Sequence, residues 1–432
     1  MLLSIGIAFG SLTAQALSNH RFSLQSQILQ SAYPEESRFK GSSELYQNVR
    51  VQPEYRLKAD SFRLKASFEA LMLNSSSFTD TLLNTQELYF RYQKSGLKAT
   101  AGFQQLNWST FDLMPDFNYL NATAFLGPLA QTQLGTLALQ MEYAISNSTF
   151  EVVYIPRQRG PQLPHPKSRW WPRDVFDLKD ALLREDATIS ELRTPQAPIY
   201  KIADFQTLNR ARDNNIGFRY QLVSSLGDFS IAAFEGLSPT PTFQSQINST
   251  VIDIDQGIVE IQNPIQLEPF LYRVRALSTT WVYPGQWGIL RAGNTINQAL
   301  GNEDILPETK TIQILSFERT WLLANESFTT TIQATHSQEE RANNQLSQLF
   351  ALFDRSLALG WRYPISFQTT LSGLSFFDLL NNGQAHYFDF NYSLTDSIKL
   401  SLGALSISGA ESSLSGLYSE NDLMFLGLKH FL

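Results

Sequence analysis

The chain of 432 residues contains no cysteine. This absence excludes disulfide-stapled scaffolds, thiolate zinc sites, iron–sulfur clusters and cysteine nucleophiles. Histidine is scarce too, since there are five and none lies at a metal-ligand spacing from another. The net charge of −7 argues against nucleic acid as a partner. We therefore expect no metal site and no cofactor.

Charged residues and long apolar runs are also few. Charged residues make up 17% of the chain, below the roughly 25% of soluble proteins. The first 20 residues resemble the apolar part of a secretory signal, with a small-x-small cleavage site at Ala14-Gln15-Ala16 but no basic n-region. Residues 1–16 are thus predicted to be a signal peptide. No later run approaches the ~18 apolar residues of a transmembrane helix, so an exported chain like this one can be a membrane protein only as a closed barrel.

Two-residue alternation is what the chain does contain. In Asn214–Val223 the side chains of Ile216, Phe218, Tyr220 and Leu222 share one face, and polar side chains occupy the other. Comparable patterns occur in 61–72, 87–93, 136–143, 354–363, 384–392 and 398–405. Such strands have one apolar and one polar face, which suits a half-buried soluble sheet or a transmembrane barrel.

The lengths of the connections favour the barrel. The predicted strands are 20–31, 45–57, 61–73, 84–93, 97–108, 134–145, 149–156, 214–223, 227–236, 270–283, 286–297, 309–323, 326–337, 351–363, 366–377, 384–394, 397–408 and 420–432. Short Gly-, Pro-, Asn-, Asp- or Ser-containing turns alternate with longer loops such as 74–83 and 157–213. An all-β, up-and-down antiparallel transmembrane β-barrel of about 18 strands, with short periplasmic turns and long external loops, has this rhythm. The segment Ser249–Ile261 is interpreted as part of an external loop, and an error there would change the strand number by two. A barrel of 16 strands is the alternative count. The soluble alternative is an exported all-β protein with two sheets.

Two segments resemble those of bacterial outer-membrane β-barrels of the porin-like type. The closing segment Asp422–Leu432 has the alternation of a terminal barrel strand, although Leu432 rather than an aromatic residue is last. The segment Gly102–Trp108 and the Asp112, Pro115, Asp116 and Asn121 that follow resemble a strand-to-loop pattern in large proteobacterial barrels. The Pro-rich run 159–170 is similar to a loop of the same group. The resemblance implies a location in the bacterial outer membrane of a Gram-negative cell, contact with lipid and lipopolysaccharide, and recognition of the last strand by the barrel-assembly machinery.

The loop 157–213 contains eleven basic and eight acidic residues in an otherwise acidic chain. Its segment Asp174–Arg193 has spacing that suits a short amphipathic helix. We expect this loop to narrow the pore, because charged loops in a lumen select solutes of opposite charge. A solvated surface lid is the alternative. Its candidate constriction residues are Arg157, Arg159, Lys167, Arg169 and Arg173.

Basic residues also exceed acidic ones at the strand positions predicted to face the lumen, which favours anions. The predicted pore-lining residues are Arg50, Arg63, Lys65, Arg91, Arg219, Arg273, Arg275 and Arg362. Mutual pairing of lumen charges is the alternative. Aromatic residues at strand ends, among them Trp108, Trp281 and Trp361, are interpreted as interfacial girdles.

Catalytic motifs are not evident, since the sequence has no G-x-S-x-G elbow and no P-loop. The prediction is therefore a channel, not an enzyme, that passes small hydrophilic, preferentially anionic solutes. Three alternatives stay open. A transporter of hydrophobic or aromatic compounds requires an apolar pocket among Phe111, Phe117, Tyr119, Phe125, Trp170 and Trp171. A lipid-acting enzyme requires a histidine within reach of a serine at the membrane rim, and a plugged docking barrel requires a filled lumen.

Overall fold

A computed structural model describes residues 20–34, 45–127, 130–165, 167–170, 191–193, 200–208, 210–239, 241–253, 258–301, 306, 309–323, 326–340, 355–380, 382–409 and 414–432. The predicted signal peptide 1–16 and Arg173 lie outside these residues. No helix within the described part of the chain has the length and apolar character needed to cross a bilayer.

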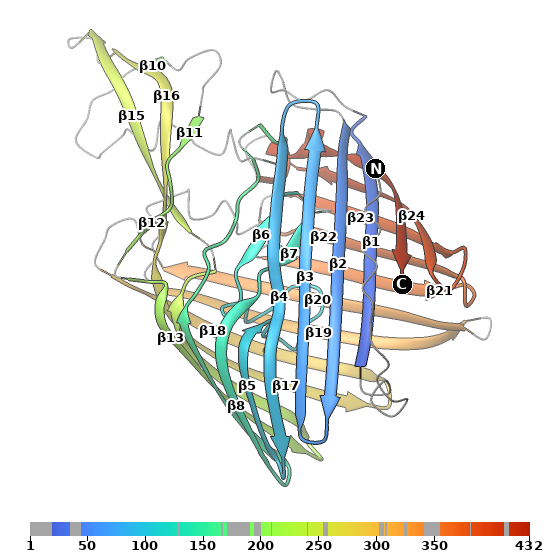
Figure 1. Ribbon diagram of the computed structural model, residues 1–432. Coiled ribbons are helices and arrows are strands. Elements are labelled where there is room, and N and C mark those ends of the chain that lie inside the picture. Colours follow the sequence, from blue (N-terminus) through green and yellow to red (C-terminus); the bar gives the residue numbers. More distant parts are fainter. Residues whose placement is uncertain are drawn as a thin grey trace, which may run out of the picture.

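Eighteen antiparallel strands close into one barrel, as predicted (Figure 1). They are β1 (His20–Ala32), β2 (Leu45–Ala59), β3 (Phe62–Ser75), β4 (Thr79–Lys94), β5 (Leu97–Gln104), β8 (Thr136–Ile145), β9 (Ser148–Arg157), β13 (Asp213–Ser224), β14 (Gly227–Leu237), β17 (Arg273–Gly285), β18 (Gly288–Leu300), β19 (Thr309–Leu323), β20 (Glu326–Glu340), β21 (Ser356–Pro364), β22 (Thr369–Asp378), β23 (Gln384–Ser393), β24 (Ile398–Ser408) and β25 (Leu423–Phe431). Each pairs with its neighbour along the chain, and β25 returns to pair with β1 from Gln25–Phe431 to Ala32–Met424. Closure leaves no sheet edge free for aggregation.

Both ends of the barrel chain lie at the same end of the barrel, here called the turn end. His20 pairs with Leu57 beside the two-residue turn between β2 and β3, and β25 ends next to the turn that opens β24. The opposite, or loop, end holds the longer connections. The prediction of a long loop at 74–83 is wrong, because β3 and β4 extend until only 76–78 separate them. A hydrogen bond from the Ser75 N–H to the Phe78 carbonyl closes this tight turn.

The outer face of the wall is apolar. Along β8 and β14, for example, Leu139, Met141, Phe229 and Ile231 are exposed, whereas the residues that alternate with them face the lumen. A soluble protein does not expose so many large apolar side chains in one belt, so this surface is suited to a bilayer. An eighteen-stranded barrel is wide enough for an aqueous lumen unless loops fold into it.

One loop does fold inward. Residues 105–135, between β5 and β8, contain the short strands β6 (Thr123–Phe125) and β7 (Gln131–Gln133), which pair with each other within the ring of barrel strands (Figure 1). Their side chains form buried clusters with residues of the barrel wall. The long loop 157–213 was expected to take this role.

A second hairpin extends beyond the loop end. Strands β15 (Thr242–Asp253) and β16 (Ile258–Leu271) form it, and β10 (Glu191–Arg193), β11 (Tyr200–Ile202) and β12 (Gln206–Thr207) add to β16 in parallel. Figure 1 shows this five-stranded sheet projecting away from the wall. The interpretation of 249–261 as part of an external loop is confirmed. The helix expected over 174–193 is contradicted at its end, where β10 is extended, and its other residues lie outside those described.

Candidate functional site: the lumen and its inward loop

Trp108 anchors the start of the inward loop. Its indole N–H donates to the Glu151 carboxylate on β9 at 2.8 Å, and the Arg219 guanidinium lies over its ring. Trp108 is buried, so its assignment to an interfacial girdle is wrong. The sequence alternation of β5 stops at Gln104, and a side chain beyond that point need not follow the strand pattern.

The tip of the loop crosses the lumen and reaches the far wall. The Met114 backbone bonds the Gln333 side chain of β20 through both its N–H and its carbonyl. Two strand glycines make room for the tip, because a Cβ atom at Gly293 would lie 2.7 Å from the Phe111 ring and one at Gly360 would lie 2.8 Å from Leu113. Glycine inside a strand commonly marks such a close approach.

A carboxyl group is buried where the loop returns. Asp116 accepts hydrogen bonds from Ser109 within the loop and from Ser278 of β17. Burial raises the pKa of this carboxyl above its usual range, against the lowering effect of the two serine hydroxyls. The loop is therefore held to the wall by a group that is costly to ionise.

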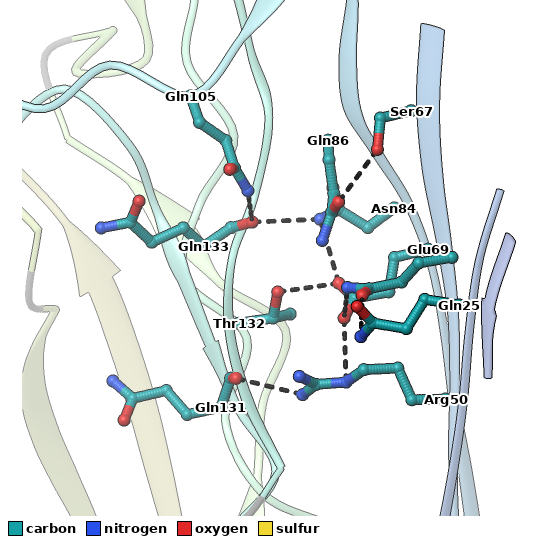
Figure 2. A network of polar contacts seen from close by, with 11 residues as sticks. Gln25, Arg50, Ser67, Glu69, Asn84, Gln86, Gln105, Gln131, Thr132 and Gln133 are labelled. Atoms are coloured by element: carbon teal, nitrogen blue, oxygen red, sulfur yellow. Dashed lines mark hydrogen bonds and ion pairs between the residues drawn. The ribbon is translucent and has the colours of Figure 1, made fainter. Parts of the chain in front are cut away.

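The end of the loop is fixed to the wall by a polar network around Glu69 (Figure 2). The Glu69 carboxylate, fully buried, forms an ion pair with Arg50 at 3.1 Å and accepts from the Thr132 hydroxyl at 2.7 Å. Asn84 and Arg50 donate to the backbone carbonyls of Gln133 and Gln131. A buried carboxylate with this many donors fixes β7 against β2, β3 and β4.

The first part of loop 157–213 crosses the mouth above the inward loop. Gln162 exchanges backbone hydrogen bonds with β6, through Thr123 and Phe125. Arg169 is then buried on the far side, where its guanidinium donates to Asn421 and to the Glu420 carbonyl and lies 4.4 Å from the centre of the Tyr33 ring. The neighbouring Trp170 indole donates to the Tyr33 hydroxyl. Arg169 therefore holds the loop in place and is shielded from a passing solute.

A cavity of about 460 Å³ lies between these two loops and the opposite wall. Its lining is largely apolar, and it includes Tyr119, Phe125, Trp170, Ile312, Ile407 and Tyr418. Three of the six aromatic residues expected in an apolar pocket thus meet here. Phe111 and Phe117 are instead buried within the loop packing, and Trp171 lies outside the described residues.

Most charged side chains of the lumen are paired. Arg219 forms an ion pair with Glu151 at 2.5 Å, and Lys98 pairs with Glu142 at 2.6 Å. Lys65 lies between Glu54 and Glu87, and Arg291 pairs with Glu318 on the wall and Asp112 on the loop. Mutual pairing, the alternative to selectivity, therefore accounts for much of the basic excess.

Two rows of basic residues contain side chains that depart from this pattern. Lys399 lies directly opposite Lys429 in the β24–β25 register, and Gln27 of β1 connects Lys429 to Arg50 of β2. Nearer the turn end, Lys58, Arg63 and Arg91 face one another across β2, β3 and β4. Among the described residues, neither Lys399 nor Lys429 has an ion pair, and both lie near the Phe431 ring. Like charges about 5 Å apart destabilise a sheet, so these neighbouring cations carry a cost in folding stability.

The remaining predicted site residues are distributed over several places. Arg362 shares the lumen-facing side of β21 with Gly360 and is without an ion pair in the described part of the chain. Lys167 is exposed at the mouth. Arg157 and Arg159 line a groove on the barrel exterior. Arg273 and Arg275 were expected in the lumen, but they point outward with Leu277 and contact Glu235, because Val274, Ala276 and Ser278 are the buried face of β17.

Sequence reasoning missed the inward loop and Lys429. The closing strand 420–432 was predicted, but its register was not, and a one-residue shift decides whether Lys429 or His430 faces the lumen. The sequence does contain a signal for the inward loop, because Phe111, Phe117, Tyr119 and Leu120 are too apolar for an exposed loop.

One serine and one histidine meet on the outer face. His386 Nδ1 lies 3.0 Å from the Ser375 hydroxyl across β22 and β23. This distance meets the requirement of the lipid-acting alternative. The structure shows no further hydrogen bond to this imidazole from the described residues, so the orienting third group of a catalytic triad is not present there. The described residues also contain no cluster of three or more His, Asp or Glu side chains able to hold a metal ion.

A scan against protein-family models and a search of curated proteins found no match. Solved structures do match. Pseudomonas aeruginosa OccK2 (OpdF), crystallised with glucuronate, aligns over 96% of both chains with a TM-score of 0.51 and 8% identity. This chain has a porin-like barrel fold. Pseudomonas aeruginosa OccK5 (OpdH) aligns over 96% of this porin-like chain and 98% of its own, with a TM-score of 0.48 and 10% identity.

Proposed function

We propose that this porin-like barrel is a channel of the bacterial outer membrane through which small hydrophilic, preferentially anionic solutes diffuse. The observation that carries the proposal is the unpaired couple Lys399 and Lys429, one strand spacing apart in the lumen and continued by Gln27 to Arg50. Lys399 and Lys429 lie near the turn end, beside the turn that precedes β24, and a solute that crosses the barrel passes along these cations. The attraction of an anion to them is strongest in a narrow lumen.

The similar fold supports this class of function, and the glucuronate complex suggests a probe. Glucuronate is a sugar acid held by OccK2, whose fold is similar. Its carboxylate is the group that lysine and arginine side chains attract. We infer that sugar acids and other small carboxylates are suitable first solutes for this channel.

The test is single-channel conductance in a planar bilayer, with the reversal potential measured under a salt gradient. The wild-type channel should conduct and favour anions, and Lys399→Gln with Lys429→Gln should lower the anion-to-cation permeability ratio several-fold. Arg275→Gln is the matched control, since it removes one exposed cation from the outer face and should leave the ratio unchanged. A wild-type protein that does not conduct, or a double variant with unchanged selectivity, contradicts the proposal.

A second candidate is uptake of apolar or aromatic compounds, which the cavity of about 460 Å³ at the mouth favours. The two candidates differ in what blocks the current. A neutral aromatic solute should interrupt conductance only if it occupies this cavity, and Trp170→Ala should then abolish the block. Interruption by glucuronate that disappears in the Lys399→Gln, Lys429→Gln variant supports the anion channel instead.

A further inference from the structure

A groove of about 990 Å³ lies on the exterior of the barrel at its loop end. Its floor is the outer face of the wall, where Leu83, Phe103 and Leu137 project from β4, β5 and β8. Each alternates with lumen-facing neighbours, so these side chains point toward the surroundings of the barrel and not into the pore. Its upper border is formed by residues 157–164 and 203–205.

Three arginines line the same groove. The Arg157 side chain is 75% exposed, and its nearest carboxylate is Asp213 at 3.9 Å. Arg159 donates to the uncharged Asn84 amide at 3.1 Å. The Arg212 Nε atom is buried and has no hydrogen-bond partner among the described residues. Asp204 is the one acidic residue of the lining, so cations predominate here.

The groove imposes a free-energy cost on the charged arginines that line it. Burial lowers the pKa of the Arg159 guanidinium, and burial together with the nearby Arg157 charge lowers that of Arg212. Each of these shifts records a penalty on the charged form that an anion in the groove would relieve. Guanidinium groups match phosphate oxygens in geometry and can bind them through two parallel hydrogen bonds.

We propose that this groove binds a phosphorylated lipid of the leaflet at the loop end of the barrel. The lipid phosphate contacts Arg157, Arg159 and Arg212, and an acyl chain lies on Leu83, Phe103 and Leu137. An apolar floor on the bilayer side, bordered by cations at the level of the rim, matches an amphiphile with an anionic head. A free anion uses only the arginines, and an apolar solute uses only the floor.

Residues 161–164 connect this groove to the pore, because they line both the groove and the cavity at the mouth. A lipid phosphate held by Arg157 and Arg159 therefore restrains the segment that covers the mouth. The proposal does not depend on the solute that the channel passes, and its failure would leave the proposed channel intact.

The test compares binding of diphosphoryl lipid A, of the same lipid after removal of its phosphates, and of inorganic phosphate to the purified full-length protein in detergent. Native mass spectrometry with increasing ligand concentration gives the affinities. Wild type should bind diphosphoryl lipid A at least tenfold more tightly than either other probe. Arg157→Gln with Arg159→Gln and Arg212→Gln should lose at least tenfold in affinity.

Arg275→Gln is the matched control, because Arg275 is also an exposed cation on the exterior with one nearby carboxylate. It should bind lipid A as wild type does. If the triple variant does not fold, as shown by heat-modifiable migration, the single Arg157→Gln change at an exposed side chain serves in its place and should lower the affinity several-fold. Equal binding of the dephosphorylated lipid, equal binding of inorganic phosphate, or an unchanged affinity in the arginine variants would overturn the proposal.

Discussion

The two halves of the lumen wall differ sharply. Strands β8, β9, β14 and β17 present small or apolar residues such as Ala138, Val153, Ala232 and Ala276, all buried beneath the inward loop. Toward the turn end, strands β24, β25 and β1 instead present Lys399, Lys429 and Gln27. Nearer the loop end, Leu29 of β1 and Phe425 of β25 also pack against the loop. The comparison shows how an eighteen-stranded barrel can be narrow. One half serves as the floor on which the loop is packed, and the other is polar toward its turn end.

The largest effect is expected when the packed half loses its anchor. Trp108→Ala removes a buried indole and its hydrogen bond to Glu151, at a cost of about 3–5 kcal/mol in unfolding free energy. The loop should loosen and the single-channel conductance should rise several-fold, with a lower thermal unfolding temperature. Trp287→Ala is the control, because Trp287 is exposed on the exterior and should change neither quantity. Unchanged conductance in Trp108→Ala would show that the loop does not limit the pore.

A smaller change should increase the charge of the polar half. Glu69→Gln keeps the shape of the buried side chain but leaves Arg50 without its ion pair, in line with the Lys429 row. We expect a higher anion-to-cation permeability ratio and a loss of stability of about 3 kcal/mol, since one partner of a buried pair remains. Glu142→Gln, whose pair with Lys98 is partly exposed, should destabilise less. The reversal potential measures the permeability ratio and thermal unfolding measures the stability, and a permeability ratio that falls in Glu69→Gln contradicts this expectation.

The pH dependence of the packed half should follow Asp116. Its pKa is raised by burial, so the folded state holds a proton that the unfolded chain releases at the ordinary aspartate pKa of about 4. Stability should therefore fall as the pH rises from about 4 through the raised pKa of Asp116. Asp116→Asn should flatten this part of the curve of unfolding temperature against pH. A wild-type stability that rises over the same interval would contradict this assignment.

The smallest effect is expected outside the lumen. Ser375→Ala removes the hydroxyl beside His386, and we expect a loss of about 1 kcal/mol in stability without any change in conductance. Phospholipid hydrolysis by the purified protein checks the enzyme alternative. Hydrolysis by wild type that disappears in Ser375→Ala would assign a catalytic role to this pair.

The architecture was predictable because alternation and connection length are local properties. Each of the 18 predicted barrel strands is present, because a strand with one face toward lipid and one toward the lumen has the same two-residue alternation wherever it lies in the barrel. The tight turn at 76–78 was missed because polar residues such as Asn74 and Thr79 look like loop residues. They extend the strands past the apolar belt instead.

The site was less predictable because it depends on register and on distant contacts. Arg275 was expected in the lumen but faces outward, and Lys429, which was not predicted as a site residue, faces the lumen. Apolar patterning near a strand end does not determine such single-residue differences in facing. The inward loop depends on Gly293 and Gly360, which lie some 180 and 250 residues later in the sequence. The reason for a glycine at these two positions is evident only from the contacts with Phe111 and Leu113.

The buried Arg169 has a consequence for the order of assembly. Its partners Tyr33, Glu420 and Asn421 lie beside β1 and β25, the two strands that meet last along the chain. The binding site for this guanidinium therefore forms only when the first and last strands pair. A barrel in which β1 and β25 are not paired cannot hold the first part of loop 157–213 through Arg169. The docking of this loop therefore indicates that the barrel has closed.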